Sequence, residues 1–304
     1  MLTSRRYSLA ALAIAFALVA GVPGLARPAG SAHHTATVWA ADASGTNVRV
    51  PKPTFAPTPV HPEKITHPGA DYPGAVNLAH APWPPPSGNL TPAARARGLR
   101  GIDISAYQGI INWAAVAPAI DFSYAKATES TYYTNPDFGN QYTTPRSYRV
   151  IRGAYHFAIP SNSTGQAQAN FFIRHGGGWS RDGLTLPGAL DIEYNPYGRE
   201  CYGLTRSQMV SWIRNFVNEY AYREHAYPVI YTSADWWATC TGNYAGFGVS
   251  DPLWIAYYAA SAGPLPLGWG SYTFWQYAPM GRLPGDQDVF NGTHARLKAL
   301  ATKG

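Results

Sequence analysis

The stretch Pro187-Gly188-Ala189-Leu190-Asp191-Ile192-Glu193-Tyr194 is a short apolar run that ends in two carboxylates with one apolar residue between them. In a β-strand, side chains two residues apart share a face and lie about 7 Å apart along the chain. Asp191 and Glu193 are therefore expected to point into the same space. Hydrolysis of a glycosidic bond needs a protonated acid near an ionised carboxylate, and crowding raises the pKa of one such group. Taken alone, this short pattern also fits a strand end without a catalytic role.

The sequence around this stretch predicts the fold. From Leu99 onward, short apolar runs alternate with amphipathic stretches, which is typical of β/α units. Strands are expected at 100–105, 122–127, 150–157, 187–194, 228–231, 253–257, 272–277 and 286–290. Helices are expected near 112–120, around 137–148, at 163–175 and after Thr205, and the last three strands follow with short links. Eight strands predict an α/β fold, a closed and modified β/α barrel of the TIM-barrel type whose last helices are reduced or lost.

The predicted strand ends carry polar and aromatic residues. In β/α barrels the chemistry lies at the carboxyl ends of the strands. The residues at these positions are Asp103, Lys126, Glu129, His156, Asp191, Glu193, Tyr231, Tyr257, Gln276 and Asp286. Several strands that deliver acids to one rim predict a carboxylate active site.

The chain divides into three predicted parts. Residues 1–26 have a basic start, an apolar run and small residues near the end, which predicts a cleavable signal peptide and a secreted protein. No other stretch is long enough to cross a bilayer, so stable membrane insertion is not expected. Residues 27–98 contain 13 of the 26 prolines and five of the nine histidines and are interpreted as a leader or linker. The histidines are irregularly spaced, which favours solvated side chains over a metal site. Residues 99–304 form the predicted catalytic barrel.

Charge and cysteine content narrow the function further. The net charge is +6, but from Leu99 onward 15 basic residues stand against 14 acidic ones. The folded part is nearly neutral, which argues against nucleic acid as a partner. The two cysteines, Cys201 and Cys240, are expected to form a disulfide in an exported protein. Closing that loop should stabilise the fold by about 4 kcal/mol.

Seven motifs, in order along the chain, resemble glycoside hydrolase family twenty-five, the Chalaropsis-type lysozymes. They are Gly101-Ile102-Asp103-Ile104-Ser105 with Tyr107-Gln108-Gly109, Ala125-Lys126-Ala127-Thr128-Glu129, Gly153-Ala154-Tyr155-His156-Phe157, Leu190-Asp191-Ile192-Glu193, Ile230-Tyr231-Thr232-Ser233, Leu253-Trp254-Ile255-Ala256-Tyr257 and Trp275-Gln276-Tyr277. The resemblance covers nearly all of residues 99–292 and does not extend to residues 27–98.

The resemblance implies an N-acetylmuramidase that cuts the β-1,4 bond between N-acetylmuramic acid and N-acetylglucosamine in bacterial peptidoglycan, on a barrel of five β/α units and three further strands. By position, Glu193 matches the general acid, Asp191 the second carboxylate, and Asp103 and Asp286 the flanking acids. The family often has Asn two residues after its last acid, where this chain has Asp288. Asp286 is preferred over Asp288 as the pocket residue.

The second carboxylate has two possible roles in this chemistry. Asp191 either attacks the anomeric carbon or holds the acetamido group of the substrate while that group attacks. Both routes retain configuration, and the sequence does not choose between them.

Aromatic and polar side chains near the strand ends suit sugar binding, because a ring stacks on a sugar face and a phenol donates a hydrogen bond. The substrate-binding candidates are Tyr107, Tyr155, Lys126, Tyr231, Trp254, Tyr257 and Gln276. Lys126 fits a contact with a pocket acid or with the lactyl carboxylate of muramic acid, and a structural salt bridge equally well. His156 is interpreted as a core histidine.

Two other readings compete with a muramidase. A non-catalytic module that binds cell-wall glycan would keep the barrel without needing Asp191 and Glu193. A chitinase-like hydrolase also uses a D-x-E strand end, usually with a further acid two residues upstream, where this chain has Ala189. The sequence has no G-x-S-x-G elbow, P-loop or H-E-x-x-H motif, so neither a cofactor nor a metal is predicted. A monomer is expected.

Overall fold

The computed structural model describes residues 39–41, 47–49 and 98–304. The predicted signal peptide, residues 1–26, and most of the predicted leader with its histidines lie outside the described residues. Within the leader, β1 (Trp39–Ala41) and β2 (Asn47–Arg49) form an antiparallel pair.

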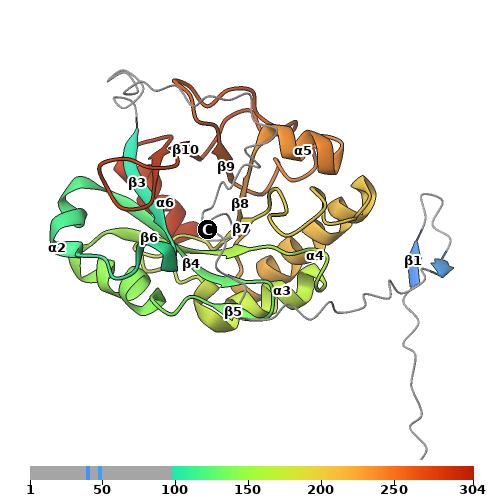
Figure 1. Ribbon diagram of the computed structural model, residues 1–304, viewed down its shortest axis with the longest axis horizontal. Coiled ribbons are helices and arrows are strands. Elements are labelled where there is room, and N and C mark those ends of the chain that lie inside the picture. The colour runs from blue at the N-terminus through green and yellow to red at the C-terminus, as the bar shows by residue number, and fades with distance from the viewer. Residues whose placement is uncertain (1–38, 42–46, 50–97) are drawn as a thin grey trace, which may run out of the picture. The chain divides into compact units, whose positions relative to one another are not determined.

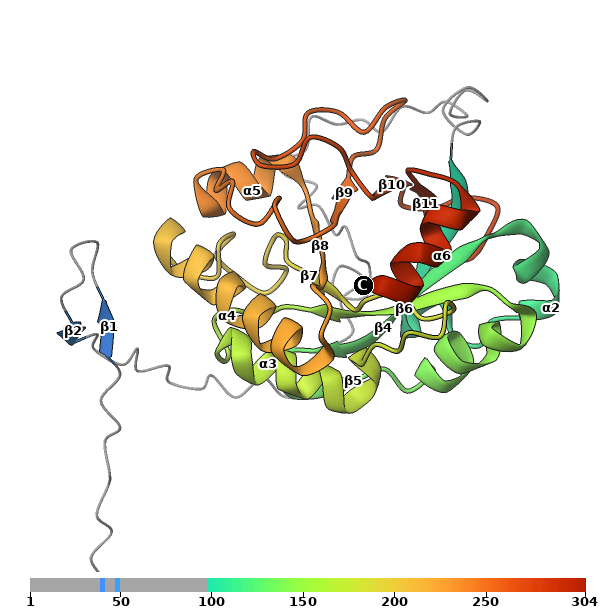
Figure 2. The ribbon, with the colours of Figure 1, turned by 180° about the vertical axis from the view of Figure 1, so that it is seen from behind.

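Eight strands close into a barrel (Figures 1 and 2). They are β3 (Leu99–Ile104), β4 (Phe122–Glu129), β6 (Ile151–Phe157), β7 (Ala189–Asp191), β8 (Val229–Thr232), β9 (Leu253–Ala256), β10 (Phe274–Ala278) and β11 (Asp286–Phe290). The strands pair in this order, and β11 pairs with β3 to complete the barrel. A short strand, β5 (Tyr133–Thr134), pairs with the end of β4. The predicted α/β barrel and all eight of its predicted strands are confirmed.

The last strand departs from the predicted parallel arrangement. β11 runs antiparallel to both β10 and β3, whereas the other barrel pairs are parallel. Residues 279–285 join β10 to β11 directly, and a parallel return needs a crossover of a dozen or more residues. The expectation of a short link before β10 is wrong, because residues 257–273 separate β9 from β10. That longer segment allows β10 to remain parallel to β9.

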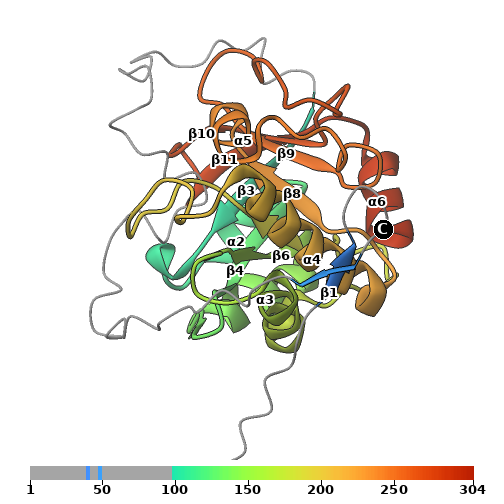
Figure 3. The same ribbon diagram turned by 90° about the vertical axis from the view of Figure 1, so that its right-hand side faces the viewer.

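Helical segments follow each of the first five barrel strands. These are α2 (Trp113–Val116) with η4 (Ala117–Ala119), η5 (Gly139–Thr143) with η6 (Thr144–Tyr148), α3 (Gly165–Phe172) with η7 (Ile173–Gly177), α4 (Arg206–Glu224), and α5 (Ala234–Thr241). Figure 3 shows α3 and α4 side by side outside the barrel. The start of α4 is fixed by a capping box in which Thr205 and Gln208 exchange hydrogen bonds with each other's backbone amides.

Three helical elements were not among the helices predicted from the sequence pattern. The short turn η3 (Ala106–Gln108) follows β3, α5 follows β8 where only a short link was expected, and α6 (His294–Lys303) follows β11. Leu297 and Ala301 of α6, the helix drawn in red in Figure 2, belong to the same apolar cluster as residues of the barrel interior. Among residues 39–41, 47–49 and 98–304, no helix has the length and apolar character needed to span a membrane.

Aromatic side chains fill the interior of the barrel. Tyr124 lies against Trp254, with ring centroids 4.8 Å apart, and both rings are fully buried. Space for the Tyr124 ring depends on Gly153 of the neighbouring strand, because a Cβ there would lie 2.1 Å from the ring. A second apolar layer, which includes Trp212 and Phe216, lies between the barrel and α3 and α4. The barrel is therefore a packed core on which only the rim is available for a ligand.

Candidate active site

The two carboxylates of the D-x-E motif lie together at the carboxyl end of β7. Asp191 is the last residue of this strand, which ends three residues earlier than the sequence predicted. The chain beyond it continues beside β8, because the amide of Ile192 donates to the carbonyl oxygen of Tyr231 at 3.0 Å. Glu193 therefore returns to the same side as Asp191, and their exposed fractions are 3% and 1%.

The environment of Asp191 disfavours ionisation of Asp191 and Glu193 at the same time. Burial raises the pKa of Asp191 well above its ordinary value of 3.8, and the adjacent charge of Glu193 raises it further. The cation of Lys126 acts in the opposite direction and lowers this pKa. Apart from the contact with Glu193, neither carboxylate oxygen of Asp191 has a hydrogen-bond partner. The two carboxyl groups thus form a coupled pair in which full ionisation is unfavourable.

Two further acids meet around the side-chain amide of Gln276 on β10. Its nitrogen donates to Asp103 Oδ2 at 2.9 Å and to Asp286 Oδ2 at 3.0 Å. Its oxygen accepts from the hydroxyls of Tyr231 and Tyr258, each at 2.9 Å. Gln276 therefore uses both ends of its amide to hold the site together.

The acids around Gln276 also bind protons more tightly than an exposed carboxylate. Burial raises the pKa of Asp103 to about 7, although hydrogen bonds with Gln276 and Asp288 lower it. Burial and the charges of Asp103 and Asp288 raise the pKa of Asp286. These groups can hold protons near neutral pH, which limits the accumulated negative charge inside the barrel.

The reversed direction of β11 places Asp286 and Asp288 at different depths. Asp286 begins β11 and pairs in register with Asp103, near the rim. Asp288 pairs with Gly101, farther into the barrel, and its Oδ1 accepts from the indole nitrogen of Trp254 at 2.9 Å. The geometry supports Asp286 as the residue nearer to a bound sugar, and its role remains a prediction.

Lys126 forms a buried ion pair with Glu129, so a protein carboxylate rather than open space faces its ammonium group. Lys126 Nζ lies 2.7 Å from Glu129 Oε2, and both side chains are fully buried. Glu129 Oε1 accepts hydrogen bonds from Tyr197 and Tyr132. Glu129 was predicted to lie at the rim without a separate role, and Tyr132 and Tyr197 were not among the predicted site residues.

Of the remaining candidates for substrate binding, three are buried and two are exposed. Tyr155, Tyr231 and Trp254 are fully buried, and the rings of Tyr231 and Trp254 pack edge to face with centroids 4.9 Å apart. Tyr107 follows β3 and is 55% exposed, while Tyr257 follows β9 and is 43% exposed. The buried rings support the acids from within the barrel, and the two exposed rings are available to a ligand.

His156 is a core residue, as the sequence predicted. Its Nδ1 lies 2.7 Å from the Thr128 hydroxyl and its Nε2 lies 2.9 Å from Gln168 Oε1. Burial lowers the pKa of His156 to about 3, although the Gln168 hydrogen bond raises it. The neutral ring joins β4, β6 and α3, and both of its nitrogens are occupied by protein groups.

The predicted disulfide is confirmed between Cys201 and Cys240, whose Cα atoms are 5.4 Å apart. It joins the loop that follows Glu193 to α5. The same loop is held by hydrogen bonds from Tyr194 to Asp235 and from the Trp236 indole to the carbonyl oxygen of Glu200. The segment beside the acid pair is therefore anchored at several points.

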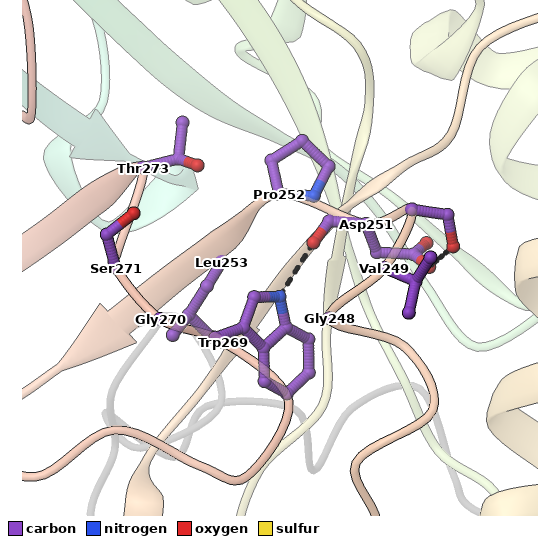
Figure 4. A pocket seen from close by; sticks show the side chains of 10 residues that line it. Gly248, Val249, Asp251, Pro252, Leu253, Trp269, Gly270, Ser271 and Thr273 are labelled. Carbon is purple, nitrogen blue, oxygen red and sulfur yellow. Dashed lines mark hydrogen bonds between the residues drawn. The ribbon is translucent and has the colours of Figure 1, made fainter.

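A separate hollow of about 300 Å³ lies near the amino ends of β9 and β10, opposite the strand ends that carry the acid pair (Figure 4). Trp269 lines it and donates its indole N–H to the carbonyl oxygen of Asp251 at 2.7 Å. Burial raises the pKa of Asp251 to about 7, and a hydrogen bond from Ser250 lowers it. None of the predicted site residues lines this hollow.

A closed β/α barrel with paired buried carboxylates at its rim is the arrangement expected of a glycoside hydrolase, and the family match places the chain in this class. Residues 102–286 match glycosyl hydrolases family 25, and the chain belongs to this family.

Named relatives agree with this assignment. Lysozyme M1 of Streptomyces globisporus is 45% identical over 258 residues, which cover 82% of this chain and 88% of the relative. An N,O-diacetylmuramidase of Chalaropsis sp is 45% identical over 209 residues, which cover 67% of this chain and 99% of the relative. The crystal structure of a bacterial lysozyme from Streptomyces coelicolor matches with a TM-score of 0.67 and 48% identity, covering 69% of this chain and 100% of that structure.

Proposed function

We propose that this protein is a secreted N-acetylmuramidase that hydrolyses the β-1,4 bond between N-acetylmuramic acid and N-acetylglucosamine of bacterial peptidoglycan, with retention of configuration. The observation that carries the proposal is the coupled pair of Asp191 and Glu193, buried at the rim of a family 25 barrel. The relatives named lysozyme and N,O-diacetylmuramidase support the choice of substrate.

In the proposed reaction, Glu193 delivers a proton to the leaving glycosidic oxygen as the bond to the anomeric carbon breaks. The electron pair of that bond stays with the leaving oxygen, which the proton neutralises. Asp191 then acts in one of two ways: its carboxylate attacks the anomeric carbon, or it stabilises the acetamido group of the substrate while that group attacks. In either case water then attacks the anomeric carbon and displaces the group that bonded to it, Asp191 or the acetamido oxygen, while Glu193 takes the proton from that water.

The acids around Gln276 have a supporting role in this proposal. Asp103 and Asp286 are held by the same amide nitrogen, at 2.9 and 3.0 Å. The Gln276 amide fixes the carboxyl groups of Asp103 and Asp286 beside Asp191 and Glu193. In these positions they can bind a sugar hydroxyl or a water molecule. Tyr231 keeps the Gln276 amide in the orientation that makes this possible.

The substrate-binding roles of the other candidates are also proposals. Tyr107 and Tyr257 offer exposed rings to the glycan. Tyr155 and Trp254 shape the interior beneath it, and Lys126 supplies a fixed positive charge that lowers the pKa of Asp191. We expect the enzyme to act as a monomer without a cofactor, and we expect the segment at residues 1–26 to direct secretion.

The proposal is tested with the full chain and purified peptidoglycan. Products are reduced with borohydride, and the new sugar ends are identified by mass spectrometry. Muramitol ends support the muramidase, whereas glucosaminitol ends overturn the bond assignment. Bound but uncut glycan would instead support the non-catalytic module.

The Glu193→Gln variant tests the acid. It should lower kcat by about 10²- to 10⁴-fold, since the amide keeps the shape and cannot donate the proton. Glu219→Gln on α4 is the matched control, because it makes the same chemical change outside the barrel. Full activity in Glu193→Gln would refute the assignment.

A further inference from the structure

Two tyrosines that no catalytic assignment uses converge on one buried carboxylate. Tyr132 lies just after β4, and Tyr197 lies in the loop between Glu193 and the disulfide at Cys201. Their hydroxyls donate to the same oxygen, Glu129 Oε1, at 3.4 and 2.5 Å. The two residues remain 41% and 37% exposed. Each phenol is thus anchored at its polar tip while more than a third of each residue is exposed.

The carboxylate that these two tyrosines share is buried and held by an ion pair. Glu129 and Lys126 are fully buried and form their ion pair through the other carboxylate oxygen of Glu129. The Tyr197 backbone is also held, because its amide donates to Asn195 Oδ1 at 2.9 Å. A ring whose position is fixed before binding loses little conformational entropy when it contacts a ligand.

Strand register places this anchor beside the acid pair. Glu129 pairs with Phe157 of β6, and Phe157 pairs with Asp191 of β7. Glu129 and Asp191 are therefore level with each other and two strands apart, which corresponds to about 10 Å between their backbones. A glycan strand that presents its scissile bond to Asp191 and Glu193 would pass this part of the rim.

We propose that Tyr132 and Tyr197 form a sugar-binding subsite that holds a pyranose ring of the glycan next to the bond that is cut. The proposal rests on the muramidase function proposed above. The ligand is a hexopyranose of the substrate strand, whose axial C–H groups pack on an aromatic face while its hydroxyls stay in water. Glu129 and Lys126 act through the tyrosines and keep both phenols oriented.

The test compares Tyr132→Ala, Tyr197→Ala and the double variant with wild type in the full chain. Tyr227→Ala is the control, since Tyr227 is 46% exposed and lies before β8, at the opposite end of the barrel. The substrate is a soluble peptidoglycan tetrasaccharide of alternating N-acetylglucosamine and N-acetylmuramic acid. Each single variant should raise KM by about 3- to 10-fold, with kcat within about twofold of wild type.

A binding measurement separates this inference from the proposed reaction. The same substitutions are made in the Glu193→Gln background, and the Kd of the tetrasaccharide is measured by calorimetry. The Kd should weaken by the same factor as KM. Tyr197→Phe, which keeps the ring and loses the anchor on Glu129, should have a smaller effect than Tyr197→Ala.

The outcomes are distinct. If wild type does not cut peptidoglycan, the proposed function fails, while the Kd values still decide whether the tyrosines bind glycan. If wild type cuts and the double variant keeps wild-type KM and Kd, the subsite is refuted. Should an alanine variant fail to fold, Tyr197→Leu retains apolar bulk without the aromatic face, and the same KM and Kd comparison applies.

Discussion

The disulfide between Cys201 and Cys240 should contribute strongly to stability and little to chemistry. Replacing both cysteines with alanine removes a cross-link between residues 39 apart in sequence. In the chain-entropy description, a loop of that length restricts the unfolded chain by about 4 kcal/mol at 25 °C. For a domain of roughly 150–250 residues, each kcal/mol changes Tm by about 2–4 °C. The variant should therefore melt about 8–16 °C below wild type.

Loss of the disulfide should change the geometry of the active site much less than it changes the stability of the fold. The loop after Glu193 keeps its hydrogen bonds from Tyr194 to Asp235 and from Tyr197 to Glu129 without the disulfide. Asp191 and Glu193 themselves are positioned by β7 and its pairing with β8. At 25 °C the variant should therefore retain most of the wild-type kcat.

Circular dichroism at increasing temperature measures the Tm of wild type, the double alanine variant and wild type treated with reductant. Reduced wild type keeps both sulfur atoms, so it separates loss of the cross-link from loss of packing around Cys240. Reduced wild type and the double alanine variant should both have a lower Tm than oxidised wild type. Equal Tm values for oxidised wild type and the double variant would refute the entropic argument.

Two further predictions concern packing and pH. Gly153→Ala should lower stability by about 1–3 kcal/mol because its Cβ would overlap a buried tyrosine ring, whereas Gly139→Ala has open space and should be neutral in the same thermal scan. Asp103 and Asp251 have folded pKa values raised from 3.8 to about 7. The protonated form of each group is therefore favoured by folding, and its contribution to the free energy of unfolding is fully present below about pH 4 and is lost as pH rises towards 7. The pKa of His156 is lowered in the folded state, so the contribution of this residue to stability increases as the pH rises from about 3 to 6.5. Asp251→Asn should reduce the decline in Tm between pH 4 and 7, and an unchanged decline would contradict the assigned pKa.

Much of the barrel was predictable because its signals are local. Apolar runs of strand length, separated by amphipathic segments, depend on side-chain periodicity within a few residues. The D-x-E motif likewise predicts that Asp191 and Glu193 share a side, and the structure places them together. The direction of β11 was missed because it depends on whether residues 279–285 return directly or cross over. That choice is not encoded in strand periodicity.

The contacts between site residues could not be predicted, and these contacts have a common feature. Tyr197 reaches a carboxylate 68 residues away in sequence, and Gln276 reaches Asp103 across 173 residues. No spacing rule along the chain relates such residues, since barrel closure alone brings their strands together. The hydrogen bond from the Trp254 indole nitrogen to Asp288 inside the barrel is another contact of this kind, and the sugar contact predicted for Trp254 stays a prediction.

The sequence by itself determined the fold class, the family resemblance, the cysteine pair and the identity of the carboxylate motif, because each depends on residue type and short-range order. Only the tertiary structure decided which acids share the Gln276 amide, which of Asp286 and Asp288 lies nearer the rim, and that Tyr132 and Tyr197 meet on Glu129. Those relations arise when β11 closes the barrel against β3 and strands far apart in sequence come into register. Register and burial are properties of the closed sheet, and burial is what raises the pKa of Asp103 and Asp191.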